Sequence, residues 1–302
     1  MAILRHYYQS LYENPVVELS GYTAAHSLPG MLYAYLDFGG ATGTAKDGLA
    51  EGMLALAMQK GKLQPGQPVV EAGASSFCTA LTLAARAAGH PVTLAVLDSL
   101  PEARRAELKA LGARLVFSSV LYGRSGMEAL AAETAQKCGG YYVDVFRNDD
   151  NPEYHRRVTG PAIVRAIDGK DHSLVDAVTI GVGTGGTITG VGETVKAWTN
   201  DVRIVAVEPY ESQAIGGGFI GKHAIPGIGA GFVPGNYNPY VVDLVAPVSS
   251  GDAAEAAREV LRTDTVPACV SAGAALCAAR RMLENGQSKA ALCVFSGRRQ
   301  YD

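Results

Sequence analysis

Residues 88–117 read AGHPVTLAVLDSLPEARRAELKALGARLVF and carry one full strand–helix–strand unit. The β-branched run Val92–Leu97 predicts a buried strand, residues 101–111 predict an amphipathic helix, and residues 114–117 predict the next strand. Glycines stand shortly before both strands, where turns are required. This order favours parallel pairing of the two strands with a right-handed crossover.

The same alternation continues in both directions along the chain. Further strands are expected at residues 68–71, 141–145, 175–182, 203–208 and 290–294. Further helices are expected through residues 81–86 and over 49–58, 127–137, 253–262 and 274–283. Residues 214–235 are rich in glycine and lack periodicity, and a loop of this length inside a compact domain is more often functional than idle. The predicted class is therefore α/β.

Composition places the chain among globular proteins and excludes several functions. At roughly 150 residues per domain, 302 residues indicate two domains or one large α/β unit. Hydrophobic residues make up 48% and charged residues 18%, enough for a sizeable core. The formal net charge is −3 and the basic residues are scattered, so we expect no nucleic-acid partner. No stretch is apolar enough to predict a membrane span.

The five cysteines are an odd number without CxxC spacing, which argues against a disulfide framework and a zinc ribbon. The first fifteen residues, MAILRHYYQSLYENP, lack the apolar run of a signal peptide. Both features favour a cytoplasmic protein. The six histidines show no metal-ligand spacing, so no metal is expected.

A glycine-rich segment, GVGTGGT at residues 181–187, follows a predicted strand and opens a predicted helix. It matches G-x-G-x-x-G, and Glu208 stands near the spacing of a ribose-binding acid, so a nicotinamide-dependent dehydrogenase is one interpretation. The broader interpretation is a site for any phosphate on backbone N–H groups at the helix start. The hydroxyls of Thr184 and Thr187 suit a compact monophosphate better than a pyrophosphate. A tight turn without ligand remains the structural alternative.

A second segment, GATGTAKDG at residues 40–48, places Lys46 at the start of a predicted helix. A single lysine there is usually a solvated surface charge. The small residues on both sides leave room for a planar ligand against the backbone. A lysine amine that is desolvated becomes nucleophilic towards an aldehyde.

With these two segments the chain resembles the cysteine synthase and cystathionine β-synthase family of pyridoxal-phosphate (PLP) enzymes, fold type II, also called tryptophan synthase β-like. ATGTAKDG is similar to the family's lysine motif and GVGTGGTITGVG to its phosphate-binding loop. Four further blocks follow the family's pattern: IVAVEPYES, HAIPGIGAGFVP, DNPEYHRRVTGPAI and VSAGAA. The resemblance extends from about Asn14 to Tyr301 and outweighs the dehydrogenase interpretation.

The resemblance implies a role for each matching residue. Lys46 would hold the cofactor and move the α-proton of the substrate. The cofactor phosphate would bind to Gly183, Thr184, Gly185, Gly186 and Thr187. Ser271 would face the pyridine nitrogen as a neutral hydroxyl, which suits β-elimination better than transamination. Capping of the following helix is a second role open to Ser271.

The substrate loop departs from the family pattern. The family's loop binds the α-carboxylate and uses an asparagine towards the cofactor. The corresponding residues here are Gly73, Ala74, Ser75, Ser76 and Phe77. Ser76 replaces the asparagine and would be the cofactor contact, whereas Phe77 replaces a threonine and takes space. Backbone N–H groups at the helix start are still expected to dock a carboxylate.

Two more positions depart from the family, since Val145 replaces a glutamine and Gly48 an arginine. Cys78 opens the predicted helix after the loop, where the helix dipole would favour a thiolate for redox or sulfur transfer. A buried core cysteine is the more ordinary interpretation of Cys78. His155 and His223 are interpreted as structural.

The resemblance implies PLP-dependent β-replacement or β-elimination on a small serine-type amino acid, such as O-acetylserine with sulfide. Two alternatives stay open: a PLP-binding homologue that has lost turnover and acts through a partner, and an ammonia-lyase or racemase. The implied architecture is a two-domain, three-layer αβα fold. A smaller lobe over residues 37–149 is set into a larger lobe of residues 1–36 and 150–302. A homodimer is expected, with Tyr7, Tyr8 and Tyr12 packing across it.

Overall fold

The computed structural model describes residues 16–169 and 173–298. The chain divides into two compact units, one of residues 1–45 and 151–302 and one of residues 46–150. Residues 37–45 group with the larger unit, because the chain after strand β2 runs beside the end of β10. The three tyrosines expected at a dimer contact lie outside the described residues. Within the described part of the chain, no helix is long and apolar enough to cross a membrane.

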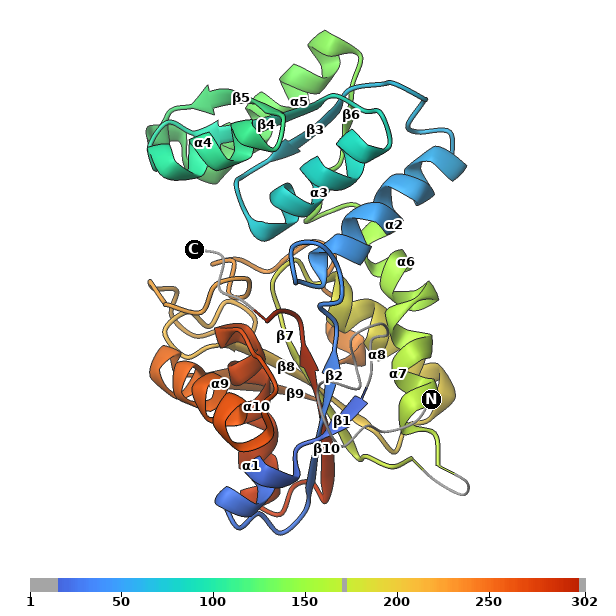
Figure 1. Ribbon diagram of the computed structural model, residues 1–302, viewed down its shortest axis with the longest axis vertical. Helices are drawn as coiled ribbons and strands as arrows, with labels where there is room; N and C mark the ends of the chain where they lie inside the picture. The colour runs from blue at the N-terminus through green and yellow to red at the C-terminus, as the bar shows by residue number, and fades with distance from the viewer. Residues whose placement is uncertain (1–15, 170–172, 299–302) are drawn as a thin grey trace. The chain divides into compact units, whose positions relative to one another are not determined.

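The larger unit contains a six-stranded sheet in the order β1-β2-β10-β7-β8-β9, parallel except for β1 (Figure 1). Its strands are β1 Val16–Glu18, β2 Met31–Leu36, β7 Ala177–Gly181, β8 Arg203–Pro209, β9 Leu244–Val248 and β10 Ala290–Phe295. Its helices are α1 Ser20–Ala25, α6 Asp150–Arg157 (which starts at the last residue of the smaller unit), α7 Thr159–Ile167, α8 Gly186–Trp198, the 3-10 turn η3 Pro239–Val241, α9 Ser250–Asp264 and α10 Val270–Glu284.

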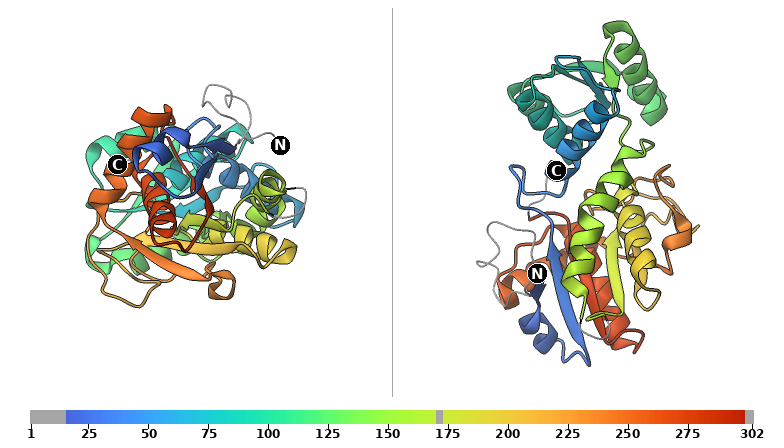
Figure 2. Two further views of the ribbon diagram at one scale, coloured as in Figure 1. Left: turned by 90° about the horizontal axis from the view of Figure 1, so that it is seen from below. Right: turned by 90° about the vertical axis from the view of Figure 1, so that its right-hand side faces the viewer.

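Two hydrophobic cores cover the two faces of this sheet. One consists of residues from α1, α9 and α10 with one side of the strands, and the other of residues from α7 and α8 with the opposite side (Figures 1 and 2). Strand residues alternate between the cores: Val205 and Val207 belong to the first, Ile204 and Ala206 to the second. The expected three-layer αβα arrangement is thus present in this unit.

Several elements of the larger unit were not expected from the sequence: β1, α1, β2, α6, α7 and β9. The run MLYAYL of β2 carries the β-branched or aromatic character of a strand only weakly. Strand β9 contains Pro247, which ordinarily argues against a strand. β9 is an edge strand that pairs only with β8, so the missing N–H is tolerated there.

The smaller unit contains a four-stranded parallel sheet in the order β5-β4-β3-β6. Its strands are β3 Val69–Ala72, β4 Val92–Leu97, β5 Ala113–Ser118 and β6 Tyr141–Tyr142. Its helices are α2 Lys46–Gln59, α3 Ser76–Ala87, α4 Glu102–Ala110, the 3-10 turn η2 Val120–Tyr122 and α5 Gly123–Cys138. Ala131 and Ala135 of α5 pack on Val70 and Ala95 of the sheet. The strand–helix–strand unit of residues 88–117 is confirmed as β4, α4 and β5.

Strand β6 is shorter than the expected strand over residues 141–145. The N–H of Val143 still donates to the carbonyl of Val70 (3.0 Å). Asp144 then adopts φ 49°, in the left-handed region, and the chain leaves the sheet. The next N–H, that of Val145, donates instead to Glu71 Oε2 at 3.2 Å.

Candidate functional site

The turn from β7 to α8 contains all five residues predicted to bind a phosphate. β7 ends at Gly181, and α8 begins at Gly186 with Gly185 as its N-cap. Gly185 has φ 84°, which an L-residue rarely adopts. The sequence GVGTGGT therefore forms a sharp strand-to-helix turn, as its pattern predicts.

Close packing explains why glycine is required at two more positions of this turn, Gly183 and Gly186. A Cβ on Gly183 would lie 2.2 Å from the carbonyl oxygen of Gly227. A Cβ on Gly186 would lie 1.8 Å from Asn151 Oδ1. A side chain at either position would require the neighbouring backbone or helix to move.

The chemistry of this turn fits a phosphate group. No side chain caps the N-terminus of α8, a helix of 13 residues, so its first N–H groups and its dipole face the turn. The hydroxyl-bearing residues Thr184, which is buried, and Thr187, which is half-buried, flank that N-terminus. Backbone N–H groups, two hydroxyls and a positive helix end form a donor set for a compact anion.

Glu208 does not support the dehydrogenase interpretation. Its buried carboxylate accepts hydrogen bonds from the backbone N–H groups of Ile215 and Gly216, both at 2.9 Å. The carboxylate is therefore used to hold the start of the glycine-rich loop of residues 214–235. The assignment of Glu208 as a ribose-binding acid is wrong for this reason.

Sequence reasoning missed the contribution of this loop to the turn. The N–H of Gly229 donates to the carbonyl of Val182 (3.0 Å), and Gly227 lies against Gly183. Directly after the loop, the carbonyl of Asn236 accepts a hydrogen bond from the hydroxyl of Thr189 in α8 at 2.7 Å. The loop therefore packs along the turn between β7 and α8. The glycines of HAIPGIGAGFVP were the available signal, because three of them take positive φ or approach another backbone.

Lys46 is half-buried and is the first residue of α2. The chain immediately before it is held by the segment that follows β10. The N–H of Ala45 donates to the carbonyl of Ser296 (2.8 Å), and the N–H of Arg298 donates to the carbonyl of Gly43 (3.1 Å). Gly43 has φ 72°. The backbone of residues 43–45, directly before Lys46, is thus held beside the end of the central sheet.

Ser271 lies next to the same segment. It is buried, and its Oγ is 3.1 Å from Cys269 Sγ and 3.4 Å from Ser296 Oγ. α10 begins at Val270 and its N-cap is Cys269, so the helix-capping role considered for Ser271 is wrong. The helix begins four residues earlier than expected because the small residues of VSAGAA pack fully into the core.

The predicted substrate loop connects β3 to α3 in the smaller unit. Gly73 has φ 115°, and Ser75 is the N-cap of α3 without a side-chain capping bond. The first N–H groups of α3 therefore have no side-chain acceptor at the cap, as a carboxylate-binding loop requires. Ser76, the first residue of α3, is half-buried, and Phe77 is 2% exposed.

Arg104 of α4 donates hydrogen bonds to the loop between β3 and α3, a contact that the sequence did not indicate. Its guanidinium donates to the carbonyl of Ala74 from Nε (3.1 Å) and Nη2 (2.8 Å), to the carbonyl of Ser75 (3.2 Å) and to Thr79 Oγ1 (2.7 Å). Its Nη1 pairs with Glu107 at 2.6 Å. Arg104 is itself buried.

Cys78 is a buried core residue, the more ordinary of its two interpretations. Burial raises the pKa of its thiol to about 12, with a contribution from the nearby Glu71 carboxyl. The thiol therefore stays protonated at neutral pH, and the thiolate expected for redox or sulfur transfer does not form.

His155 and His223 both make structural hydrogen bonds. His223 Nε2 is 2.9 Å from the carbonyl of Gly229, and its Nδ1 accepts from the N–H of Ile225 (3.2 Å). His155 is buried between Thr159 and Thr187. Among the described residues, no group of three or more His, Cys, Asp or Glu side chains is arranged to hold a metal ion.

The family profile described as pyridoxal-phosphate dependent enzyme matches residues 8–297. The chain belongs to this family, and PLP is its cofactor. The fold type and the cofactor expected from the resemblance are thereby confirmed.

Among known proteins, the chain is similar to the cysteine synthase of Staphylococcus aureus, with 34% identity over 265 residues that cover 87% of this chain and 84% of the relative. Among solved structures it is similar to O-ureido-L-serine synthase (TM-score 0.87, 28% identity, 98% and 92% covered). It is also similar to the cysteine synthase of Entamoeba histolytica (TM-score 0.85, 29% identity, 98% and 88% covered).

The donor set of the β7–α8 turn fits the phosphate of PLP, and the primary amine of Lys46 fits its aldehyde. When bound, PLP supplies an electron-withdrawing ring that stabilises negative charge at the Cα of an attached amino acid.

Proposed function

We propose that this enzyme catalyses β-replacement on a small serine-type amino acid, as a cysteine synthase does with O-acetylserine and sulfide. The names of the similar proteins, cysteine synthase and O-ureido-L-serine synthase, support a serine-type substrate. The observation that carries the proposal is the uncapped N-terminus of α8 between Thr184 and Thr187, because it is a site for a compact phosphate.

The proposed roles follow from the chemistry of each residue. Residues 183–187 bind the cofactor phosphate through backbone N–H groups and two hydroxyls. Lys46 holds the cofactor covalently through Nζ and, once released, takes the proton from the substrate Cα. The hydroxyl of Ser271 would face the pyridine nitrogen, where a neutral hydroxyl does not enforce a protonated ring as a carboxylate would. This arrangement would suit loss of the β-substituent better than transamination.

The loop of residues 73–77 binds the substrate α-carboxylate with the N–H groups at the start of α3. Ser76 contacts the cofactor in place of the family's asparagine. Arg104 supports this role by fixing the carbonyl groups of Ala74 and Ser75, so that the N–H groups keep their direction. A preorganised loop binds a carboxylate without the cost of ordering on each turnover.

Covalent trapping tests the cofactor assignment. The purified protein should absorb visible light, and borohydride reduction followed by peptide mass mapping should find the cofactor on Lys46. The Lys46→Ala variant should lose the reducible adduct, while Lys60→Ala, which changes the lysine directly after the last residue of the same helix, should keep it. Protein that stays colourless and takes up no added PLP would contradict the proposal.

A panel of amino acids with product analysis tests the reaction. O-acetylserine and sulfide should yield cysteine by mass spectrometry. Ammonia with a keto acid, or a racemised amino acid, would identify the ammonia-lyase or racemase alternative.

A second candidate is a PLP-binding protein that has lost turnover and acts through a partner. Ser76, Phe77 and Val145 favour it, because the first and last lack the amide groups that the family places there and Phe77 adds bulk. No spectral change and no product across the panel, with the cofactor bound, would favour this candidate.

Two further expectations belong to the same proposal. We expect a homodimer in the cytoplasm; the odd number of free cysteines supports a reducing compartment. Analytical ultracentrifugation and cell fractionation test the two expectations.

A further inference from the structure

Helix α6 contacts the β7–α8 turn through two side chains one helical turn apart. Asn151 Nδ2 donates to Thr184 Oγ1 at 3.0 Å. His155 Nε2 lies 3.1 Å from Thr187 Oγ1. Both side chains are at most 1% exposed. Each hydroxyl of the turn thus has its own buried partner on α6.

Two glycines of α8 make this approach possible. A Cβ on Gly186 would overlap Asn151 Oδ1 at 1.8 Å, and a Cβ on Gly190 would lie 2.5 Å from His155 Cβ. Residues spaced by four share one face of a helix. The pair Gly186 and Gly190 on α8 therefore matches the pair Asn151 and His155 on α6.

The hydrogen-bond partners of Thr184 and Thr187 determine where each hydroxyl proton points. A threonine hydroxyl has one proton to donate. Thr184 accepts from the amide of Asn151, so its own proton points elsewhere. His155 Nδ1 lies 2.9 Å from Thr159 Oγ1, and a hydroxyl can donate to an unprotonated ring nitrogen. In the tautomer that accepts this bond, the imidazole proton is on Nε2 and is directed to Thr187 Oγ1.

We propose that Asn151 and His155 are positioning residues that turn the hydroxyl protons of Thr184 and Thr187 towards the cofactor phosphate. This inference rests on the phosphate site proposed above. It adds a second layer of residues that never touch the cofactor but set the direction of its two hydroxyl donors. Hydrogen bonds from a neutral donor to a phosphate are among the stronger ones, so misdirecting either is costly.

The first test measures how fast the holoenzyme loses its cofactor to an excess of a PLP-scavenging apoenzyme. Asn151→Leu and His155→Leu should each release PLP about tenfold faster. His155→Gln, which keeps an N–H group near the Nε2 position, should restore slow release. Circular dichroism and urea midpoints identify any variant that has merely failed to fold.

Double variants show whether Asn151 and His155 act through the two threonine hydroxyls or only through the packing of α6 on α8. In a Thr187→Val background, His155→Leu should add no further effect, because the hydroxyl through which it acts is gone. Asn151→Leu should likewise add nothing to Thr184→Val. The phosphorus NMR signal of the bound cofactor should move equally in the single and the double variants. Additive effects would overturn the inference.

The tautomer of His155 can be measured in the wild-type holoenzyme, with a variant needed only for assignment. In holoenzyme labelled with ¹⁵N-histidine, the His155 resonances, identified by their absence from His155→Gln, should show a proton on Nε2. A proton on Nδ1 alone would overturn the assignment for Thr187.

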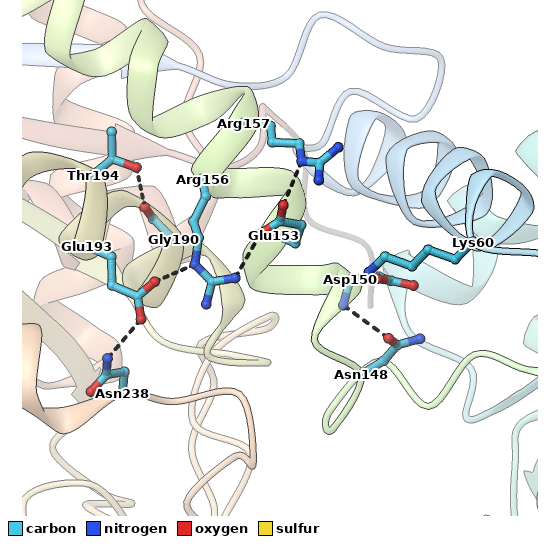
Figure 3. A network of polar contacts seen from close by, with 10 residues as sticks. All are labelled: Lys60, Asn148, Asp150, Glu153, Arg156, Arg157, Gly190, Glu193, Thr194 and Asn238. Atoms are coloured by element: carbon cyan, nitrogen blue, oxygen red, sulfur yellow. Dashed lines mark hydrogen bonds and ion pairs between the residues drawn. The ribbon is translucent and has the colours of Figure 1, made fainter. Parts of the chain in front are cut away.

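Arg157 provides the matched control on the same helix. It pairs with Glu153, in the network that also links Arg156 with Glu193 (Figure 3). Arg157→Ala should leave cofactor release unchanged. If the wild type takes up no PLP, the proposed function fails. If Thr184→Val and Thr187→Val speed release while the α6 variants do not, this inference alone fails.

Discussion

Two neighbouring arginines in α4 show how differently the fold uses the same residue type. Arg104 is buried and donates to the carbonyls of Ala74 and Ser75, whereas Arg105 donates to the carbonyl of Leu100 (2.7 Å) and lies 5.0 Å from the Phe117 ring. In the sequence the pair looks like ordinary helix-surface charge. Only the position of α4 beside the β3–α3 loop distinguishes the two residues.

We predict that Arg104→Met destabilises the protein by about 2 kcal/mol, because two loop carbonyls and the Thr79 hydroxyl lose a buried charged donor. Amide hydrogen exchange in residues 73–79 should accelerate. Arg105→Met is the matched control and should cost less than about 1 kcal/mol. Equal effects of the two variants on residues 73–79 would contradict the role given to Arg104.

At the scale of elements, the approach of α6 to α8 depends on glycine. A Cβ on Gly190 would lie 2.5 Å from His155 Cβ and from the carbonyl of Pro152. We predict that Gly190→Ala lowers the free energy of unfolding by about 1–3 kcal/mol despite the better helix propensity of alanine. The urea midpoint measures this.

Gly251, in the first turn of α9, provides the control for Gly190. A Cβ there meets no atom closer than Ser249 Oγ at 3.9 Å. Gly251→Ala should be neutral or stabilising, by up to about 1 kcal/mol. Loss of stability in both variants would mean that close packing is not the cause at Gly190.

The glycine-rich loop after β8 is held by the carboxylate of Glu208. We predict that Glu208→Gln, which replaces one acceptor oxygen by an N–H donor facing a backbone N–H, opens the loop. Tryptic cleavage after Lys222, which is exposed, should become roughly fivefold faster or more. Asp201→Asn on the surface is the control. An unchanged cleavage rate would show that other contacts order the loop.

At the scale of the whole molecule, each unit has its own sheet, and buried hydrophobic residues of the same unit pack on it. The smaller unit carries a buried carboxyl group at the end of its central strand β3. Burial raises the pKa of Glu71 to about 8, and the nearby carboxylates of Asp144 and Glu128 contribute in the same direction. Hydrogen bonds from Ala72 and Val145 oppose this shift without cancelling it.

Global stability should therefore depend on pH through Glu71. The folded state binds this proton more tightly than the unfolded state, whose pKa is near 4.5. The stabilisation is complete below pH 4.5 and is lost as the pH rises through about 8, with a slope of at most ~1.4 kcal/mol per pH unit. Urea unfolding from pH 5 to pH 8.5 should show this loss in the wild type.

Glu71→Gln should flatten that dependence, since the amide does not titrate and its oxygen keeps one backbone hydrogen bond. Glu133→Gln, on the surface of α5, should leave the slope unchanged. If the free energy of unfolding of Glu71→Gln still falls with pH as in the wild type, other groups cause the pH dependence.

The sequence by itself determined the α/β class, most strands of both sheets and the family. These features depend on local periodicity and on contiguous motifs such as GVGTGGT and ATGTAKDG. Hydrophobic alternation and turn glycines act within a few residues, so they are readable without the fold. The weak strand patterns of β2 and β9 were missed because their neighbours in the sheet, rather than their own residues, stabilise them.

Only the tertiary structure decided which residues support the site. Asn151 and His155 meet Thr184 and Thr187 across 33 and 32 residues of sequence, and Arg104 meets Ala74 across 30. The tertiary structure also shows that Glu208 binds the backbone of the loop after β8 rather than a ligand. It shows as well that α10 begins before Ser271. Buried polar groups must find partners wherever the packed chain brings them, and no local pattern records which partner that is.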